Sequence, residues 1–166
     1  MPPEIEGLSR IDVAVLTICC NRSFELRHRL IDDEWLSAET EALGITIEDV
    51  VQTQEVLANR GYAEVLWTGG PKHICSLTIT EPGFNQYART RPDYKHALET
   101  VGLMIVRDEY WGSDQMMEQS DLAPRLIEHA LFVLDSHGLI RTTMMMDGDV
   151  VVDYVSPELR REIEAG

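Results

Sequence analysis

Lysine is nearly missing from this chain of 166 residues, which has only Lys72 and Lys95. Arginine supplies the other basic side chains, and 14 Lys and Arg residues face 29 Asp and Glu residues, giving a net charge of −15. The excess of acidic residues is similar in the two halves of the chain, with 7 basic against 14 acidic residues in 1–90 and 7 against 15 in 91–166. The chain therefore has no basic tail or basic half that would attract the phosphates of a nucleic acid.

Long hydrophobic runs and paired cysteines are also missing. No run approaches the roughly 20 apolar residues that a helix needs to span a bilayer. The one early run, VAVLTICC at 13–20, follows Glu4, Glu6 and Asp12 with only Arg10, whereas a signal peptide begins with a positive segment. Three cysteines, two of them adjacent, make a poor disulfide framework. We therefore expect a cytoplasmic protein that contacts no membrane and keeps its thiols reduced.

Motifs for catalysis and for cofactor binding are lacking as well. The turn TGGPK at 68–72 is too short for a phosphate-binding glycine loop and lacks its Lys-Ser or Lys-Thr ending. His73 and Cys75 share one face of a predicted strand. Cys19 or His28 could join them around a metal, but structural zinc sites have tighter and repeated spacing. With no partner to orient a Cys–His nucleophile pair, the sequence predicts a protein that is not an enzyme and holds no metal or cofactor.

An internal repeat becomes visible when Gly61 is aligned with Gly138. The stretch VVQTQEVLANRGYAEV then lies over IEHALFVLDSHGLIRT, with apolar residues at helical spacing up to each glycine. Glycine suits the left-handed position that follows the end of a helix. The sequence predicts helices at Ile47–Arg60 and Ala123–Ser136, each followed by a glycine with positive φ.

A predicted β-hairpin follows each glycine. The predicted strands are 62–67 and 74–79 in the first copy, and 139–145 and 150–155 in the second. The turns TGGPK and MDGD contain Gly-Gly and Asp-Gly, which favour hairpins because the central residues need positive φ. Thr80 and Ser156 then have the chemistry of helix N-caps, and Pro157 suits the first position of a helix.

Two further helical segments precede each repeat. They are predicted at 8–20 and 38–44 in the first copy, and at 94–110 and 114–119 in the second. Residues 21–31 indicate an added helical turn or helix, and Pro92 breaks any continuous helix across 85–95. The sequence thus predicts two units, 1–90 and 91–166, in a mainly α fold with small β wings, an α+β protein.

This order of helix, helix, turn, helix, glycine, two-stranded wing and capped helix resembles the winged helix-turn-helix superfamily. ALGITIEDVVQTQEVLANRGYAEV and SLTITEPGFNQYA carry the resemblance over 36–88, and 94–164 follow it more loosely. The resemblance implies tandem winged-helix domains. Such domains serve DNA-binding regulators and protein-only assemblies alike. In layout and acidity the chain is similar to tandem winged-helix subunits that bind kleisin bridges or trafficking complexes.

The resemblance makes Ile47–Arg60 the helix that would read DNA. Its outward positions would be Glu48, Asp49, Gln52, Thr53, Glu55 and Asn59, and Gln and Asn can read adenine edges. The candidate DNA contacts are Gln52, Thr53, Asn59, Lys72, His73, Arg27, Arg29 and Arg89. Between Arg29 and Arg60, however, eight acids occur without one Lys or Arg, and phosphate contacts dominate affinity for DNA. DNA binding is therefore disfavoured, unless the wing and the flanking arginines form a basic stripe.

The second predicted helix, 123–136, is less acidic and has features of a protein interface. The candidate interface residues are Phe132, Val133, Arg125, His129 and Trp111. Alternatively, these side chains complete a core between the two units. Phe132 favours a two-fold homodimer, because an aromatic side chain of about 150–250 Å² is costly to leave in water. At least one of Met144, Met145 and Met146 is expected to point outward, and otherwise the methionines are expected to pack against the neighbouring helix.

Two functions remain open at this point. We expect a non-enzymatic regulatory or scaffold protein that acts through contacts with a protein partner or with a second copy of itself. The alternative is a DNA-binding transcription regulator that uses its wing and flanking arginines. The charge pattern favours the first, because acidic helices repel the DNA backbone.

Overall fold

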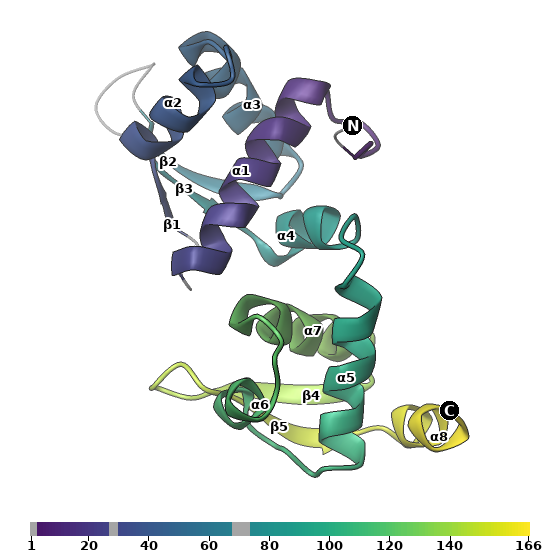
Figure 1. Cartoon of the computed structure of the whole chain (residues 1–166). Helices are drawn as coiled ribbons and strands as arrows, with labels where there is room; N and C mark the ends of the chain where they lie inside the picture. Colours follow the sequence, from purple (N-terminus) through teal and green to yellow (C-terminus); the bar gives the residue numbers. More distant parts are fainter. Residues whose placement is uncertain (1–2, 27–29, 68–73) are drawn as a thin grey trace. The chain divides into compact units, whose positions relative to one another are not determined.

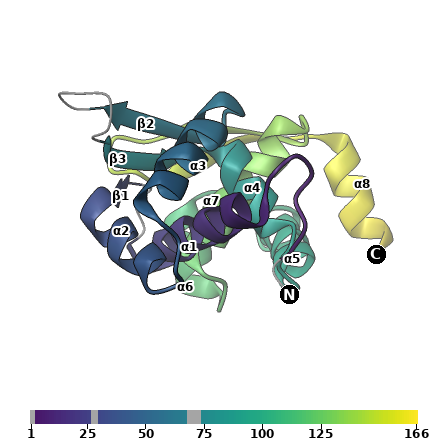
Figure 2. The same cartoon turned by 90° about the horizontal axis from the view of Figure 1, so that it is seen from above.

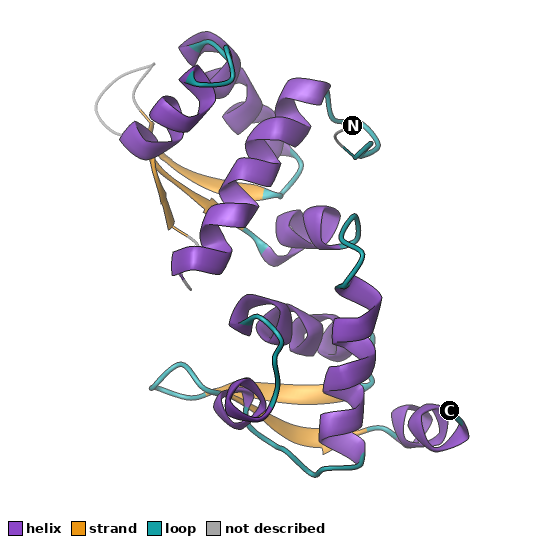
Figure 3. Ribbon diagram, viewed as in Figure 1, coloured by secondary structure: helices purple, strands orange, loops and turns teal. Residues whose placement is uncertain are grey.

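The computed structural model describes residues 3–26, 30–67 and 74–166 and has a mixed α and β fold (Figure 1). Helices predominate among these residues, and the strands form two small antiparallel sheets (Figure 3). The predicted fold class, mainly α with small β elements, is confirmed at this level. The chain divides into two compact units, Met1–Thr90 and Arg91–Gly166, here called the first unit and the second unit.

The first unit consists of a three-stranded sheet and the helices that pack with it. Its elements are α1 (Arg10–Leu26), β1 (Leu30–Asp32), α2 (Asp33–Glu41), α3 (Ile47–Asn59), β2 (Ala63–Trp67), β3 (Ile74–Ile79) and α4 (Glu81–Ala88). The strand order is β1-β3-β2, so β3 pairs antiparallel with both neighbours (Figure 2). Large apolar side chains from the helices and the sheet fill the core: Leu16, Ile31, Leu36, Leu57, Leu77, Ile79 and Phe84.

Helices α1 and α3 begin with the same reciprocal cap. The Asp12 N–H donates to Ser9 Oγ at 3.1 Å, and the Ser9 N–H donates to Asp12 Oδ2 at 2.8 Å. In α3 the Asp49 N–H donates to Thr46 Oγ1 at 3.1 Å, and the Thr46 N–H donates to Asp49 Oδ2 at 3.4 Å. Each cap satisfies N–H groups that a helix start leaves without an intrahelical partner, which fixes where the helix begins.

The prediction for residues 21–31 is wrong at its C-terminal end. Residues 21–26 continue α1, but Leu30–Asp32 form strand β1, which pairs with β3. Ile31 is buried between exposed Leu30 and Asp32, which is the alternation of a half-buried strand. Three residues are too few for that alternation to stand out in the sequence, so pairing with β3 decides the conformation.

The second unit contains a two-stranded sheet and four helices. Its elements are α5 (Tyr94–Val106), α6 (Ser113–Gln119), α7 (Pro124–Ser136), β4 (Ile140–Met144), β5 (Val150–Val155) and α8 (Pro157–Ala165). A single antiparallel bridge joins Gly112, just before α6, to Val151 on β5. The centre of its core consists of apolar side chains from α5, α6, α7 and the hairpin: Val101, Ile105, Met116, Ile127, Leu131 and Ile140.

The two glycines of the repeat end their helices in the same way. Gly61 has a φ of 72° and Gly138 a φ of 71°, so the predicted positive φ is confirmed at both positions. The N–H after each glycine donates to the carbonyl five residues earlier, from Tyr62 to Leu57 at 2.8 Å and from Leu139 to Leu134 at 3.0 Å. This is the Schellman pattern of helix termination, which a left-handed residue makes possible.

The repeat continues into the helix that follows each hairpin. The N–H of Thr80 donates to the Tyr62 carbonyl at 3.1 Å, and the N–H of Ser156 donates to the Leu139 carbonyl at 2.8 Å. The hydroxyl oxygens of Thr80 and Ser156 accept hydrogen bonds from the first turns of α4 and α8, so both predicted N-caps are confirmed. The last strand of each hairpin is thereby tied to the residue that follows the glycine.

Among the described residues, no helix combines the length and the apolar character that crossing a membrane requires.

Candidate functional site

Helix α3 of the first unit presents an acidic and polar face to solvent. Glu48, Gln52, Glu55 and Asn59 are exposed along it. The sequence from 30 to 59, which includes α2 and α3, contains no Lys or Arg. A partner that approaches this face therefore meets carboxylates and amides.

Thr53 does not belong to that face, and its prediction as a DNA contact is wrong. It is only 1% exposed, and its hydroxyl donates to Asp12 Oδ1 on α1 at 2.8 Å. Positions three or four residues apart share a helix face, which places residue 53 with buried Val50 and Leu57. The polar character of threonine concealed a core position that the helical spacing would have indicated.

The other candidate DNA contacts fall into two groups. Gln52, Asn59 and Arg89 are exposed. Arg27, Arg29, Lys72 and His73 lie outside the described residues, and so does the predicted turn TGGPK at 68–72.

Helix α7 of the second unit buries most of the predicted protein interface. Arg125, His129 and Val133 are all buried, which corrects the expectation that they offer an open surface. Helix α7 is buried on more than one side, so its spacing does not separate a single core face from an exposed face. Phe132 remains 39% exposed, and its ring stacks on that of His129 with 6.0 Å between the ring centroids.

A second exposed apolar group lies at the hairpin of the second unit. Trp111 is 40% exposed, although its carbonyl accepts the N–H of Val152 at 2.7 Å. Met144, Met145 and Met146, at the end of β4 and in the turn, are all exposed. The expectation that the methionines pack against a helix is wrong, because β4 ends at Met144 and the turn begins there.

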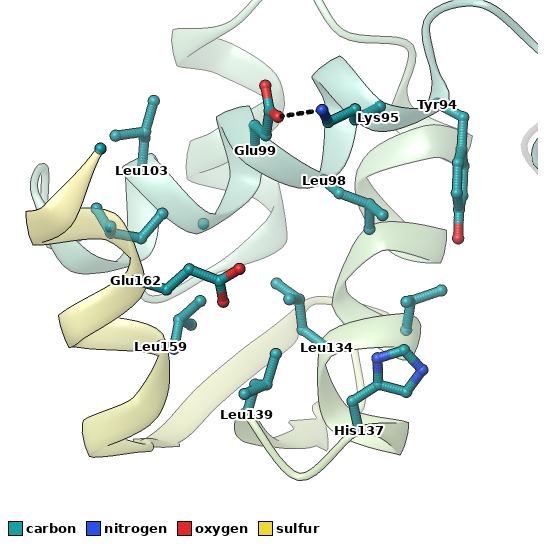
Figure 4. Close-up of a pocket in the computed structure, with 14 residues that line it drawn as sticks. Tyr94, Lys95, Leu98, Glu99, Leu103, Leu134, His137, Leu139, Leu159 and Glu162 are labelled. Atoms are coloured by element: carbon teal, nitrogen blue, oxygen red, sulfur yellow. Dashed lines mark ion pairs between the residues drawn. The ribbon is translucent and has the colours of Figure 1, made fainter.

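A groove of about 580 Å³ lies in the second unit, between α5, α8 and the end of α7 (Figure 4). Its apolar lining comes from all three helices and from the residue after Gly138: Leu98, Leu103, Val133, Leu134, Leu139, Leu159 and Ile163. Its polar lining is Tyr94, Lys95, Glu99, His137 and Glu162. The sequence analysis did not predict this groove. Leu98 and Leu159 are apolar residues on the predicted helices, and such residues indicate helix faces that pack against another part of the protein or against a ligand.

Gly102 brings α8 close to α5 beside this groove. A Cβ atom at Gly102 would lie 3.1 Å from Ile163 Cδ1 and 3.9 Å from Leu159 Cδ1. Only Leu159 of α8 is fully buried. Helix α8 is thus attached through a narrow line of contact, and its charged side chains border the groove.

The Cys19 thiol of α1 is unsuited to nucleophilic chemistry. Burial raises the pKa of this thiol to about 12, so it stays protonated at neutral pH. The described residues also contain no group of three or more His, Cys, Asp and Glu side chains that could hold a metal ion.

No known family model matches the chain, and no curated protein is significantly similar to it.

Proposed function

We propose that this protein is a non-enzymatic regulatory or scaffold protein, built from two winged-helix units, that acts mainly through protein contacts. The winged-helix interpretation is supported by the common order of elements in both units. In each, a helix is followed by a short paired segment, two helices, a glycine, a hairpin and a capped helix. In the first unit the sheet order β1-β3-β2 places the hairpin beside the short strand.

The acidic face of α3 is the observation that carries the protein-contact proposal. In a helix-turn-helix protein that binds DNA, this helix enters the major groove, and half to two-thirds of the hydrogen bonds go to phosphate and sugar. Here Glu48 and Glu55 are exposed on α3, and no Lys or Arg occurs between 30 and 59. Bringing this face against phosphates costs electrostatic free energy, whereas a protein partner can supply complementary basic groups.

Exposed aromatic side chains in the second unit support the same proposal. Phe132 and Trp111 are each exposed to about two-fifths, and aromatic side chains are enriched in the centres of protein interfaces. We assign Phe132 to a two-fold interface between copies of the chain.

The dimer is tested by sedimentation velocity of the wild-type protein and of Phe132→Asp. The wild type should sediment as a dimer, and the variant as a monomer with unchanged helical content by circular dichroism. Phe132→Leu is the matched control and should retain the dimer, because the side chain stays apolar. A monomeric wild type, or a variant that unfolds, would assign Phe132 to the interior of the chain.

DNA binding by a transcription regulator is the second candidate function, and exposed Gln52, Asn59 and Arg89 favour it.

Fluorescence anisotropy with duplex DNA at 50 mM and 200 mM salt separates the two functions. On the main proposal binding is weak and unchanged in Gln52→Ala. If the flanks bind DNA instead, Arg89→Ala or Lys72→Ala should reduce the salt slope by about one unit for each phosphate that is no longer neutralised. A nanomolar, sequence-specific complex at physiological salt that Gln52→Ala abolishes would overturn the main proposal.

A further inference from the structure

The groove of the second unit has the size and lining of a ligand site. Its volume is about 580 Å³, and small-molecule sites are commonly about 300–1,000 Å³ with mostly apolar walls. On α5 the lining runs from Tyr94 to Leu103, roughly 14 Å at 1.5 Å per residue. The space therefore suits an elongated small molecule.

The apolar lining is incompletely covered within the second unit. Leu98, Leu103, Leu139 and Ile163 are only partly buried, although each borders the groove. Covering such surface releases free energy in proportion to the apolar area removed from water. An occupant with an apolar body would gain that free energy without any rearrangement of the helices.

The charged groups at the groove favour a cation. In Figure 4 the Glu162 carboxylate extends from α8 across the groove toward Leu134. The Glu162 carboxylate forms no ion pair or hydrogen bond within the part of the chain that the structure describes. Glu99 pairs with Lys95 at 3.6 Å, but both side chains are largely exposed, so this pair holds the carboxylate weakly.

The overall charge of the protein fits the same choice. The negative field of a chain with net charge −15 adds a long-range attraction for cations and repels anions.

We propose that this groove binds a small organic cation with an elongated apolar body, such as a long-chain amine. The ammonium group lies at the Glu162 carboxylate, and the apolar body covers Leu98, Leu139 and Leu159. The groove lining contains neither Phe132 nor Trp111, so the site does not use the side chains assigned above to protein contacts.

Isothermal titration calorimetry of the full-length protein with decylammonium, decanol and decanoate, each below its micelle or solubility limit, tests the proposal. Decylammonium should bind with a stoichiometry of one, decanol more weakly and decanoate weakest. Glu162→Gln should weaken decylammonium roughly two- to fivefold, the size of a partly exposed ion pair, and leave decanol unchanged. Glu164→Gln, an equal charge change on α8 away from the groove, should have no effect.

Methyl chemical shifts locate the bound amine independently of affinity. Addition of decylammonium should shift the methyl signals of Leu98, Leu139 and Leu159. Decanoate binding as tightly as decylammonium, an equal loss in Glu164→Gln, or shifts confined to other residues would each overturn the proposal.

Discussion

At the scale of single residues, buried polar groups limit what α3 can offer to a partner. Thr53 and Gln54 are polar, yet both are 1% exposed. Thr53 is satisfied by Asp12, which also accepts the Ser9 N–H at the start of α1. One carboxylate therefore both caps α1 and joins it to α3, so losing the threonine hydroxyl affects the packing of two helices.

We expect Thr53→Val to lower the free energy of unfolding by about 1–3 kcal/mol, because a buried Asp12 oxygen loses its donor while the side-chain volume is kept. Urea unfolding at neutral pH measures the change. Thr53→Ser, which retains the hydroxyl, should lose clearly less. If the Val variant were as stable as the wild type, the hydrogen bond would contribute nothing.

The Cys19 thiol gives a second prediction at this scale. Its pKa is raised from 9.0 to about 12 by burial, so the folded state favours the protonated thiol. Its contribution to stability is complete below pH 9 and is lost as the pH rises from about 9 to 12, where only the unfolded chain ionises.

In a Cys75→Ser background, thiol reagents at pH 8 should react with Cys19 and Cys20 only as fast as the protein unfolds. Rapid native labelling of Cys19 would contradict its burial.

At the scale of elements, the end of the third helix in each unit depends on one glycine. A Cβ atom at Gly61 or Gly138 would contact nothing within 4 Å, so space does not prevent a substitution. The positive φ alone disfavours a substitution, because in the left-handed region a Cβ atom collides with the backbone of its own residue.

Gly61→Ala and Gly138→Ala should therefore destabilise the protein by similar amounts, about 1–2 kcal/mol each, whatever the neighbouring sequence. Asn at either position should cost less, because Asn tolerates the left-handed region. Thermal or urea unfolding compares the four variants. Very different costs of the two alanines would show that the helix ends are not equivalent.

At the scale of the whole molecule, the charge of −15 opposes the folded state, because folding brings like charges together. The ion pairs of Arg91 with Asp93 and of Lys95 with Glu99 offset little of this repulsion, because they join near neighbours in the sequence and are partly exposed. Arg91 hydrogen-bonds Asp93 and lowers the pKa of that carboxyl, which keeps the charge in place as the pH falls.

Salt should consequently stabilise the protein. Raising NaCl from 10 to 150 mM shortens the screening length from about 30 Å to about 8 Å. We expect Tm to rise by about 2–4 °C, which corresponds to roughly 1 kcal/mol for a chain of this size. KCl should act like NaCl if screening is the cause. A Tm that falls or stays constant would show that charge repulsion is not a significant term.

Local sequence is sufficient for the parts of the fold that depend on near neighbours. Helix ends at Gly61 and Gly138, caps at Thr80 and Ser156, and the hairpin that ends at Val155 all follow from local φ preferences and from hydrogen bonds within a few residues. Helix α3 was predicted at 47–60 and spans Ile47–Asn59 for the same reason. These features need no knowledge of what lies across the core.

Long-range packing, in contrast, determines which polar side chains face solvent and where a groove remains. Thr53 is buried because Asp12 lies opposite it, 41 residues earlier in the chain. Strand β1 exists because β3 pairs with it, and the groove exists because Gly102 lets α8 rest on α5 through Leu159 and Ile163. Burial and pairing depend on which distant segment packs against a residue, and residue type and periodicity do not specify that partner.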